Sequence, residues 1–522
     1  MFNTLKVDVM DKSSEDFMRD VPRGDSTRFL RQQSVPQARW MKLDDIAAST
    51  ALAYDPRKPG KKVLIGALGS RLIGIEDSRH LLTVAGSQSG KSVGLIGNLH
   101  FYPGSVLATD PKGELAGITA KRRAAMGQRV YVLDPFGTAP ASVKALRAAY
   151  NPMDVLMLTS PTLLEDAALI GEAIVIQSAD AKEPHWDESA KNFIEGVIVH
   201  VATADRHAHR RTLVTVRELL KRALWVEPQD KDADEKKPKA KRRPTLFLEM
   251  MENAEALESE PETADIGSAV MGATLDFYGK GENEMAGVLS TVHRHTKFLD
   301  YTAFRNILGR SDFRLEELKT APEGMSVYLC FPGMRMELSK RWLRIFVNQM
   351  LNAMESEKTK PAVPVLACLD EFPVLGYMKS LEIASGLLAS CGVKLWAILQ
   401  DWSQGKALYG ERWETFAGNA GVIQFFANND LTTTEYISRR LGKTPVEVAR
   451  VGEVAQDQRD KGVLGRSDSI ELHDLLTADE VMRQFARDDR LQRQLVIWAG
   501  HHPMMLQRVV YYESKGPLGP FV

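Results

Sequence analysis

An eight-residue segment, AGSQSGKS, fits the spacing of a phosphate-binding loop. The apolar run HLLTV lies directly before this segment, and SVGLIGNL, which has a helical pattern, begins at its last residue. Between a strand and a helix, backbone N–H groups and the helix N-terminus can surround a polyphosphate. We therefore expect nucleotide phosphates to be bound by Ala85, Gly86, Ser87, Gln88, Ser89, Gly90, Lys91 and Ser92.

Individual residue types within this loop suggest separate tasks. Its two glycines would allow the tight turn, Lys91 would reach the β- and γ-phosphates, and Ser92 would place its hydroxyl on Mg²⁺. Ala85 stands where a first glycine is usual, and Gln88 stands where many such loops have another. We therefore expect the backbone of this loop to have slightly less conformational freedom than in most loops of this kind.

A pair of carboxylates follows the apolar run VPVLACL. At the carboxyl end of a buried strand, Asp370 would hold Mg²⁺ through water, and Glu371 would polarise the attacking water. The next strand-like run, VKLWAIL, is followed by Gln400, which would reach the same sheet edge and sense or position the γ-phosphate. Taken alone, the acidic pair has an alternative interpretation as a cap for the following helix.

These side chains need a sheet that brings several strand ends to one edge. Short apolar, β-branched runs bounded by turn residues recur along the chain, and most do not alternate, which is typical of parallel strands covered on both faces. Helical patterns lie between them, as at 341–357 and 380–391. This alternation indicates an α/β fold with a doubly wound, mostly parallel sheet. We expect strands at 61–68, 80–86, 105–110, 129–134, 325–331, 363–370, 393–400, 421–427, 494–500 and 506–513.

Strand-like runs disappear between about residue 160 and residue 322, where long amphipathic stretches take over. We therefore expect an all-α domain, 160–322, inserted into an α/β domain made of 60–159 and 323–522. A polar N-terminal segment, 1–59, precedes both.

Two charged segments lie inside the expected insertion. A loop near 229–244 contains DKDADEKKPKAKRR, which we interpret as a solvated loop, with a phosphate-contacting patch as the alternative. The cluster HRHTKF at 293–298 could stack on single-stranded DNA and neutralise it, but we interpret it as a solvated helix face.

The whole composition narrows the class of protein. The 522 residues include 67 Lys and Arg against 68 Asp and Glu, so nucleic-acid binding would depend on local patches. Cys330, Cys368 and Cys391 lack the spacing of a metal site, and we interpret them as buried thiols in a reducing cytosol. No stretch reaches the about 18 consecutive apolar residues of a membrane span, and the N-terminus is too polar for a signal peptide. As written, the sequence predicts a soluble, cytoplasmic polypeptide.

Together these elements resemble the type IV secretion coupling proteins of the TraG/TraD kind, which are conjugative-transfer ATPases of the RecA-like, FtsK/HerA-related superfamily. The resemblance covers roughly 60–515, and DPKGEL after a strand is more specific than a generic nucleotide motif. The segments that carry it are SVLATDPKGELAGIT (105–119), VLDPFG (132–137), YNPMDVL (150–156), HWDESAKNFIEGVIVHV (185–201), LDEFPVLG (369–376), ILQDWSQ (398–404), YISRRLGKT (436–444) and ELHDLLTADEVMR (471–483).

The resemblance implies a RecA-like P-loop domain that binds ATP and Mg²⁺ and hydrolyses ATP. It also implies a homo-oligomeric ring, a hexamer when assembled, with ATP between neighbouring subunits. Such a ring would recruit a single-stranded DNA–relaxase complex and drive it into a type IV secretion channel. The inserted helical domain would face substrates and adaptor proteins.

Two pairs of residues gain candidate roles from the resemblance. An arginine from a neighbouring subunit usually completes such a site, because γ-phosphate cleavage builds negative charge, and Arg439 and Arg440 are the candidates. Their alternative is a pair of surface arginines on a helix. Asp110 and Lys112 in DPKGE would lie near the phosphates or a subunit interface. The alternative for these two is a helix N-cap followed by an exposed lysine.

Membrane attachment and cargo remain open at this point. Family members typically begin with transmembrane helices, and none is evident in this sequence. Either the anchor has been removed, or this form docks on inner-membrane components of the secretion system at the cytoplasmic face of the bacterial inner membrane. Two other functions remain: a coupling receptor for secreted effector proteins, and an ATP-binding assembly platform with little motor activity.

Overall fold

The computed structural model describes residues 38–176, 185–226, 243–451 and 466–521. The main sheet has eleven strands, which follow the order β2-β1-β13-β12-β9-β3-β8-β7-β4-β6-β5. The strands from β9 to β5 in this order are all parallel to one another. Their bounds are β9 Ala420–Phe426, β3 His80–Ala85, β8 Val393–Leu399, β7 Val365–Leu369, β4 Val106–Asp110, β6 Met325–Cys330 and β5 Arg129–Leu133. The mostly parallel α/β sheet predicted from the sequence is therefore confirmed.

The parallel strands read as continuous apolar runs because both of their faces are covered. In β3, for example, Leu82 and Val84 belong to one hydrophobic core, whereas Leu81 belongs to another. The first core continues into α14 (Met336–Ser356), and the second includes apolar residues of α4 (Lys91–Phe101) and α5 (Glu114–Ala125). Successive side chains of a strand point to opposite faces, so a doubly covered strand needs apolar residues at every position.

Four strands at the other edge are antiparallel, which the sequence did not predict. These are β12 (Arg493–Trp498), β13 (Met504–Gln507), β1 (Val63–Leu68) and β2 (Arg71–Ile75). The prediction of a strand at 506–513 was largely wrong, because β13 ends at Gln507. The strand β2 was missed, although Gly69 and Ser70 between it and β1 form a two-residue hairpin connection of a recognisable kind.

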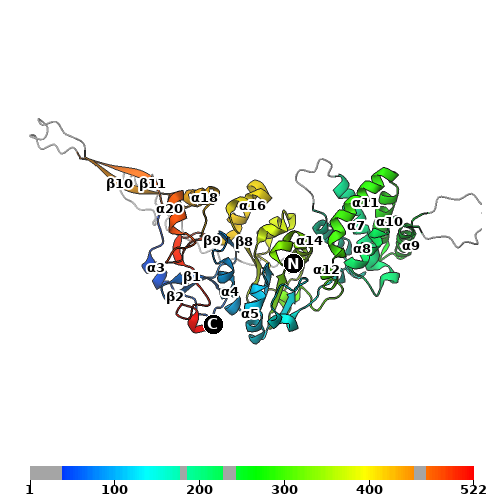
Figure 1. The fold of residues 1–522 in the computed structure, drawn as a ribbon, viewed down its shortest axis with the longest axis horizontal. Coiled ribbons are helices and arrows are strands. Elements are labelled where there is room, and N and C mark those ends of the chain that lie inside the picture. Colours follow the sequence, from blue (N-terminus) through cyan, green and yellow to red (C-terminus); the bar gives the residue numbers. More distant parts are fainter. Residues whose placement is uncertain (1–37, 177–184, 227–242, 452–465, 522) are drawn as a thin grey trace, which may run out of the picture.

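The described residues between β5 and β6 form helices and no strand. Figure 1 shows α7 to α11 gathered at the end of the molecule away from β1 and β2. The hydrophobic core of one sheet face runs without interruption into this helical part. The expected boundaries at 160 and 322 remain predictions. The helices are α6 Leu163–Ile174, α7 His185–Thr203, α8 Leu213–Lys221, α9 Thr245–Glu258, α10 Ala264–Tyr278 and α11 Glu282–Thr296. Most of the charged loop near 229–244 lies outside the described residues.

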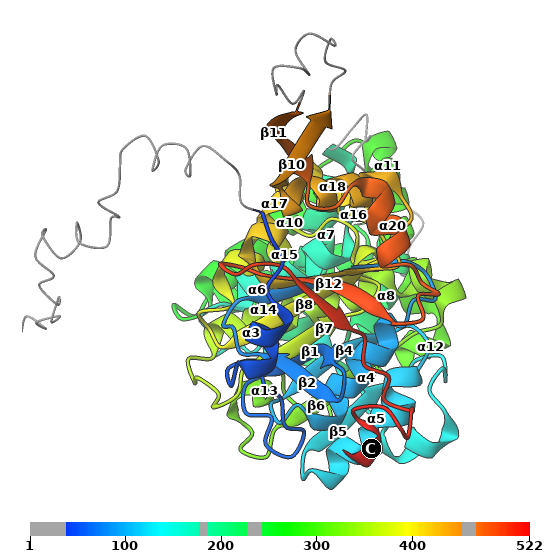
Figure 2. The same cartoon turned by 90° about the vertical axis from the view of Figure 1, so that its left-hand side faces the viewer.

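Two features depart from the expected organisation. A two-stranded hairpin, β10 (Lys443–Val451) with β11 (Arg466–Asp474), projects beyond α18 (Leu431–Leu441) and is not part of the main sheet (Figures 1 and 2). In the N-terminal segment, residues from 38 onward pack on the α/β part, with Ile46 and Leu52 fully or almost fully buried. Part of the segment that the sequence suggested as a separate polar unit is therefore folded against the sheet.

The helices and the cysteines were each the subject of a prediction from the sequence. None of the helices in the described ranges combines the length and apolar character that a membrane crossing requires. Cys330 and Cys368 are buried, as expected, whereas Cys391 is half-buried, and all three thiols are free.

Candidate functional site

A cleft of about 710 Å³ opens where β3 ends and α4 begins. Its lining includes Ser87 to Gly94 together with Asp110, Lys112, Asp370 and Glu371. These residues come from the carboxyl ends of β3, β4 and β7, which are parallel strands. The carboxyl edge of a parallel sheet is where such folds bind ligands. The structure therefore brings the predicted phosphate loop and the predicted carboxylate pair to one site.

The loop is a tight turn whose glycines are both required. Gly90 has a φ of 92°, in the region that favours glycine, and Gln88 has a φ of 55° without being glycine. A Cβ on Gly86 would lie 2.1 Å from the backbone oxygen of Ala427, so that position has no room for a side chain. The Ser89 hydroxyl donates a hydrogen bond of 2.6 Å to the Gly86 carbonyl, which closes the turn.

Ala85 and Lys91 mark the two ends of this turn. Ala85 is fully buried in a small apolar cluster with Phe426 and Ala427, which explains why a small side chain is accommodated there. The Lys91 Nζ donates to the Ala85 carbonyl at 2.9 Å. Burial lowers the pKa of Lys91, and the nearby carboxylates of Glu371 and Asp370 oppose that shift. Ser92, half-buried, follows on α4 and also lines the cleft.

The acidic pair also lines the cleft, and its two members have different environments. Asp370 is 6% exposed, and burial, with the negative charge of Glu371, raises its pKa to about 7. Glu371 is less buried and has a φ of 53°, which is unusual for a residue with a side chain. The Gln400 amide, directly after β8, donates to the two Glu371 carboxylate oxygens at 3.3 and 3.4 Å. The three side chains predicted to lie at this edge are therefore neighbours.

Asp110 and Lys112 reach the same cleft with different surroundings. Asp110 is 1% exposed, and its carboxylate accepts a hydrogen bond of 2.9 Å from the backbone N–H of Ala116, in the first turn of α5. Asp110 thus accepts from the first turn of α5 without being its N-cap, which is Gly113. Burial raises the pKa of Asp110, and hydrogen bonds from the α5 backbone oppose the shift. Lys112 is exposed and lines the cleft, so its ammonium is accessible to an anion there.

Arg439 and Arg440 lie apart from the cleft of their own chain. Both are exposed in the last turn of α18, and neither contributes to the lining. The Arg440 guanidinium lies 5.8 Å from the Tyr436 ring centroid and donates to its hydroxyl. These contacts are compatible both with a surface pair and with a contribution to a neighbouring subunit.

The interpretation of HRHTKF as a solvated helix face is wrong for part of the segment, because Arg294 and Lys297 are exposed but other members are buried. His295 is 2% exposed and hydrogen-bonds to Asp187 at 3.0 Å and to Arg341 at 3.1 Å. Thr296 and Phe298 are buried as well. His295 joins α11 to α7 and α14, whereas the Arg294 side chain is 63% exposed although it also pairs with Asp187. The buried His295 and Phe298 rings are therefore not available to stack on DNA.

Arg508 contributes to the site and was not predicted. Its guanidinium donates to the carbonyl oxygens of Ser89 at 2.8 Å and Arg487 at 3.1 Å, and it lies 5.4 Å from the Phe426 ring centroid. It therefore attaches the phosphate loop to the segment after β13. No local sequence signal links residues 89 and 508, because their contact depends on the antiparallel edge.

Comparison with known families adds an independent observation. Residues 39–518 match the model of the family described as type IV secretory system conjugative DNA transfer. The chain belongs to this family. The match confirms the resemblance inferred from the motifs, and it includes the phosphate loop, the carboxylate pair and Arg508.

Individual relatives within the conjugative DNA transfer family are distant. The conjugal transfer protein TraG of Escherichia coli is 27% identical over 77% of this chain and 61% of its own length. The coupling protein VirD4 of Bartonella quintana is 23% identical over 84% of this chain and 63% of its own length. The chain thus spans about three fifths of the length of these curated relatives.

A solved structure shares the fold. The bacterial conjugative coupling protein TrwBdeltaN70 superposes with a TM-score of 0.60 at 14% identity, covering 91% of this chain and 97% of its own. TrwB has also been solved in complex with ADP and Mg²⁺, with a TM-score of 0.58 at 15% identity, covering 87% of this chain and 95% of its own. At this identity the likeness shows the fold, and it confirms the expected architecture.

Proposed function

We propose that this protein is an ATP-hydrolysing coupling protein that recruits a DNA–relaxase substrate and drives it into a type IV secretion channel. The observation that carries the proposal is the meeting of the phosphate loop with Asp370 and Glu371 in one cleft, where Gln400 hydrogen-bonds to Glu371. Support comes from the family match and from the relatives named as conjugal transfer and coupling proteins. TrwB, which has the same fold, was solved with ADP and Mg²⁺ and with a non-hydrolysable ATP analogue.

The donor set of the cleft fits ATP and Mg²⁺. The loop backbone and Lys91 suit phosphate oxygens, and the Ser92 hydroxyl with the Asp370 carboxylate supplies the oxygen ligands that Mg²⁺ prefers. When bound, Mg²⁺ neutralises charge on the β- and γ-phosphates. Because Asp370 is buried beside another carboxylate, a bound cation would also offset the cost of its charge.

The cleft residues would divide the work of hydrolysis. Lys91 would hold the phosphates, and Glu371 would accept a proton from the attacking water. The Gln400 amide would keep the Glu371 carboxylate in place through its two hydrogen bonds. The Arg508 donors are directed to backbone carbonyls of the loop and its neighbours, so its role would be to position the loop.

A cation facing the γ-phosphate would come from a second subunit. Arg439 or Arg440, exposed at the end of α18, would supply it in a ring whose subunits complete one another's sites. In that assembly, expected to be hexameric, the helices α7 to α11 would face cargo and adaptors. The ring would work with inner-membrane components of the secretion system, at the cytoplasmic face of the bacterial inner membrane.

Paired substitutions in the cleft test this proposal. We expect Lys91→Ala to lose nucleotide binding, measured with a fluorescent ATP analogue, because the phosphates lose the cation that would hold them. We expect Glu371→Gln to keep binding but to lower turnover by about 100-fold or more, which is the usual contribution of a general base. Normal turnover in Glu371→Gln would contradict the assignment of Glu371 as the base.

A further inference from the structure

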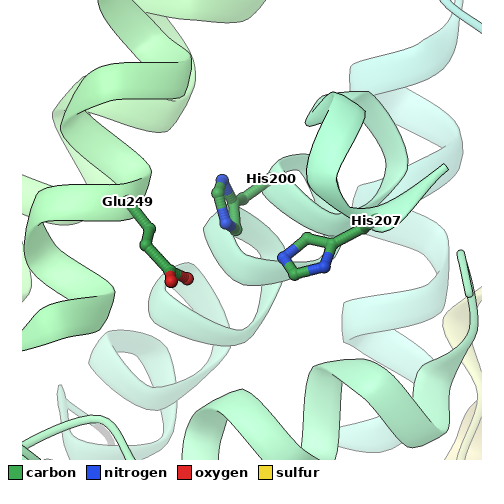
Figure 3. Close-up of side chains that lie close together, drawn as sticks. All are labelled: His200, His207 and Glu249. Carbon is green, nitrogen blue, oxygen red and sulfur yellow. The ribbon is translucent and has the colours of Figure 1, made fainter.

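A second group of side chains with metal-binding chemistry lies in the helical part, away from the nucleotide cleft. His200 is in the last turn of α7, His207 is in the short 3₁₀ helix η3 (Asp205–His207), and Glu249 is on α9. Figure 3 shows the two imidazoles and the carboxylate converging from these three elements. One ligand atom from each residue lies within 4.8 Å of those of the others.

Both imidazoles are buried without hydrogen-bond partners. His200 is 0% exposed and His207 is 1% exposed. All four of their ring nitrogens lack a hydrogen-bond partner among the residues that the structure describes. A buried polar atom left unpaired destabilises the folded state, so four such atoms in one place require an explanation. The buried His295 of the same helical part is different, because its ring contacts Asp187 and Arg341.

Glu249 has an oxygen to spare for a further partner. One carboxylate oxygen, Oε1, forms an ion pair of 2.5 Å with Nη1 of Arg206. The Arg206 side chain also contacts Glu252, at 3.0 Å through Nη2. A cation at the histidines could therefore engage Glu249 while Arg206 keeps an acidic partner.

We propose that His200, His207 and Glu249 bind a divalent transition-metal ion, with Zn²⁺ as the best match. Two imidazole nitrogens and one carboxylate oxygen are ligand types that Zn²⁺ accepts, and three protein ligands leave a fourth position for water. A metal here would satisfy one nitrogen on each ring. It would also link the end of α7 and η3 to the start of α9, and so hold these three elements together. The proposal is independent of the nucleotide site.

Zinc retention by the purified full chain tests this site. The protein is treated with a chelator, dialysed, loaded with Zn²⁺ alone, and dialysed again before the metal is counted by mass spectrometry. The variants are His207→Gln and Glu249→Gln, and the matched control is His209→Gln, since His209 is exposed two residues from His207. Circular dichroism of the metal-free proteins shows whether each variant folds like the wild type.

We expect the wild type and His209→Gln to retain one Zn²⁺ per chain and to gain thermal stability from it. We expect His207→Gln and Glu249→Gln to bind at least about 10-fold more weakly, and to lose that gain, because each removes a direct ligand. Replacing Zn²⁺ by Co²⁺ should give the intense visible bands of a tetrahedral site in the wild type and in His209→Gln. The variants His207→Gln and Glu249→Gln should lack these bands. A wild type that retains no Zn²⁺, or equal retention in His207→Gln and His209→Gln, would overturn the proposal.

Discussion

Glu371 is held in a backbone conformation that a residue with a side chain seldom adopts. Its φ of 53° lies in the left-handed region, where a non-glycine residue stores about 1–3 kcal/mol of strain. The Asp370 backbone before it is fixed by a hydrogen bond of 2.7 Å from the Thr109 hydroxyl to the Asp370 carbonyl. The Gln400 amide holds the carboxylate itself. Surrounding contacts therefore determine where the proposed base points.

This arrangement makes Gln400 a positioning residue whose loss has a specific signature. In Gln400→Ala, the Glu371 carboxylate loses both amide hydrogen bonds and becomes free to reorient. We expect kcat for ATP hydrolysis to fall by about 10-fold or more, with little change in KM, because the phosphate-binding groups are unaltered. Steady-state kinetics at saturating Mg²⁺ measure both constants. A change in KM with unaltered kcat would contradict a role in positioning the base.

At the residue scale, the sequence predicted what depends on local context. The phosphate loop, Asp370, Glu371 and Gln400 each follow a strand, so their common edge could be inferred from the pattern of strands alone. Arg508 could not, because its contact with Ser89 joins segments far apart in the chain. The contact of Asp110 with α5 was not decided by the sequence, since a carboxylate after a strand can serve a ligand or a helix.

At the scale of elements, the junction of the phosphate loop with the end of β9 is a point of close packing. We expect Gly86→Ala to lose about 1–3 kcal/mol of unfolding free energy, because its Cβ would collide with the Ala427 backbone oxygen. Nucleotide affinity should fall with it as the loop shifts. Urea denaturation and a binding titration measure the two effects.

The control for this change is Gly272→Ala, an exposed position inside α10 with no neighbouring atom within 4 Å of the added Cβ. We expect it to stabilise the protein by about 0.5–1 kcal/mol, as alanine does in place of glycine within a helix. Equal stability of Gly86→Ala and wild type would show that the close approach to Ala427 is not required.

The contact between α6 and α7 should make stability depend on pH. Glu195 on α7 lies against Gly171 of α6, and burial raises its pKa to about 7. Between the pKa of Glu195 in the unfolded chain and pH 7, the folded state binds the Glu195 proton more tightly than the unfolded state does. The free energy of unfolding of the wild type therefore falls as pH rises through that window. We expect the free energy of unfolding of Glu195→Gln, relative to that of the wild type, to rise by about 2 kcal/mol from pH 5 to pH 8. Urea denaturation at both pH values measures the difference, and a pH-independent difference would contradict the assignment.

There are physical reasons why the sequence patterns missed some elements. The strands β10 and β11 form a separate hairpin away from the main sheet, so they lack the continuous apolar run that marked the buried strands. The hairpin of β1 and β2 was missed because only one of its two strands was recognised. Part of the segment HRHTKF was misread because His295 is paired inside the helical part, where neighbouring helices supply Asp187 and Arg341.

At the scale of the whole molecule, the near-zero net charge acquires a specific meaning. The formal charge of −1 provides no general attraction for DNA, so contacts with a DNA cargo would be confined to local surfaces. The cleft of one chain holds the phosphate loop, the metal-binding candidates and the proposed base, whereas Arg439 and Arg440 are exposed elsewhere. An assembly in which one subunit faces the cleft of the next would bring these parts together.

The central claim is that subunits complete one another's ATPase sites and respond to DNA. The most direct test is the ATPase rate per chain measured over a range of protein concentrations, with and without single-stranded DNA. We predict that the rate per chain rises with concentration, that DNA raises it further, and that added salt weakens the DNA effect through counterion release. A rate per chain that is independent of concentration and indifferent to DNA would contradict the account.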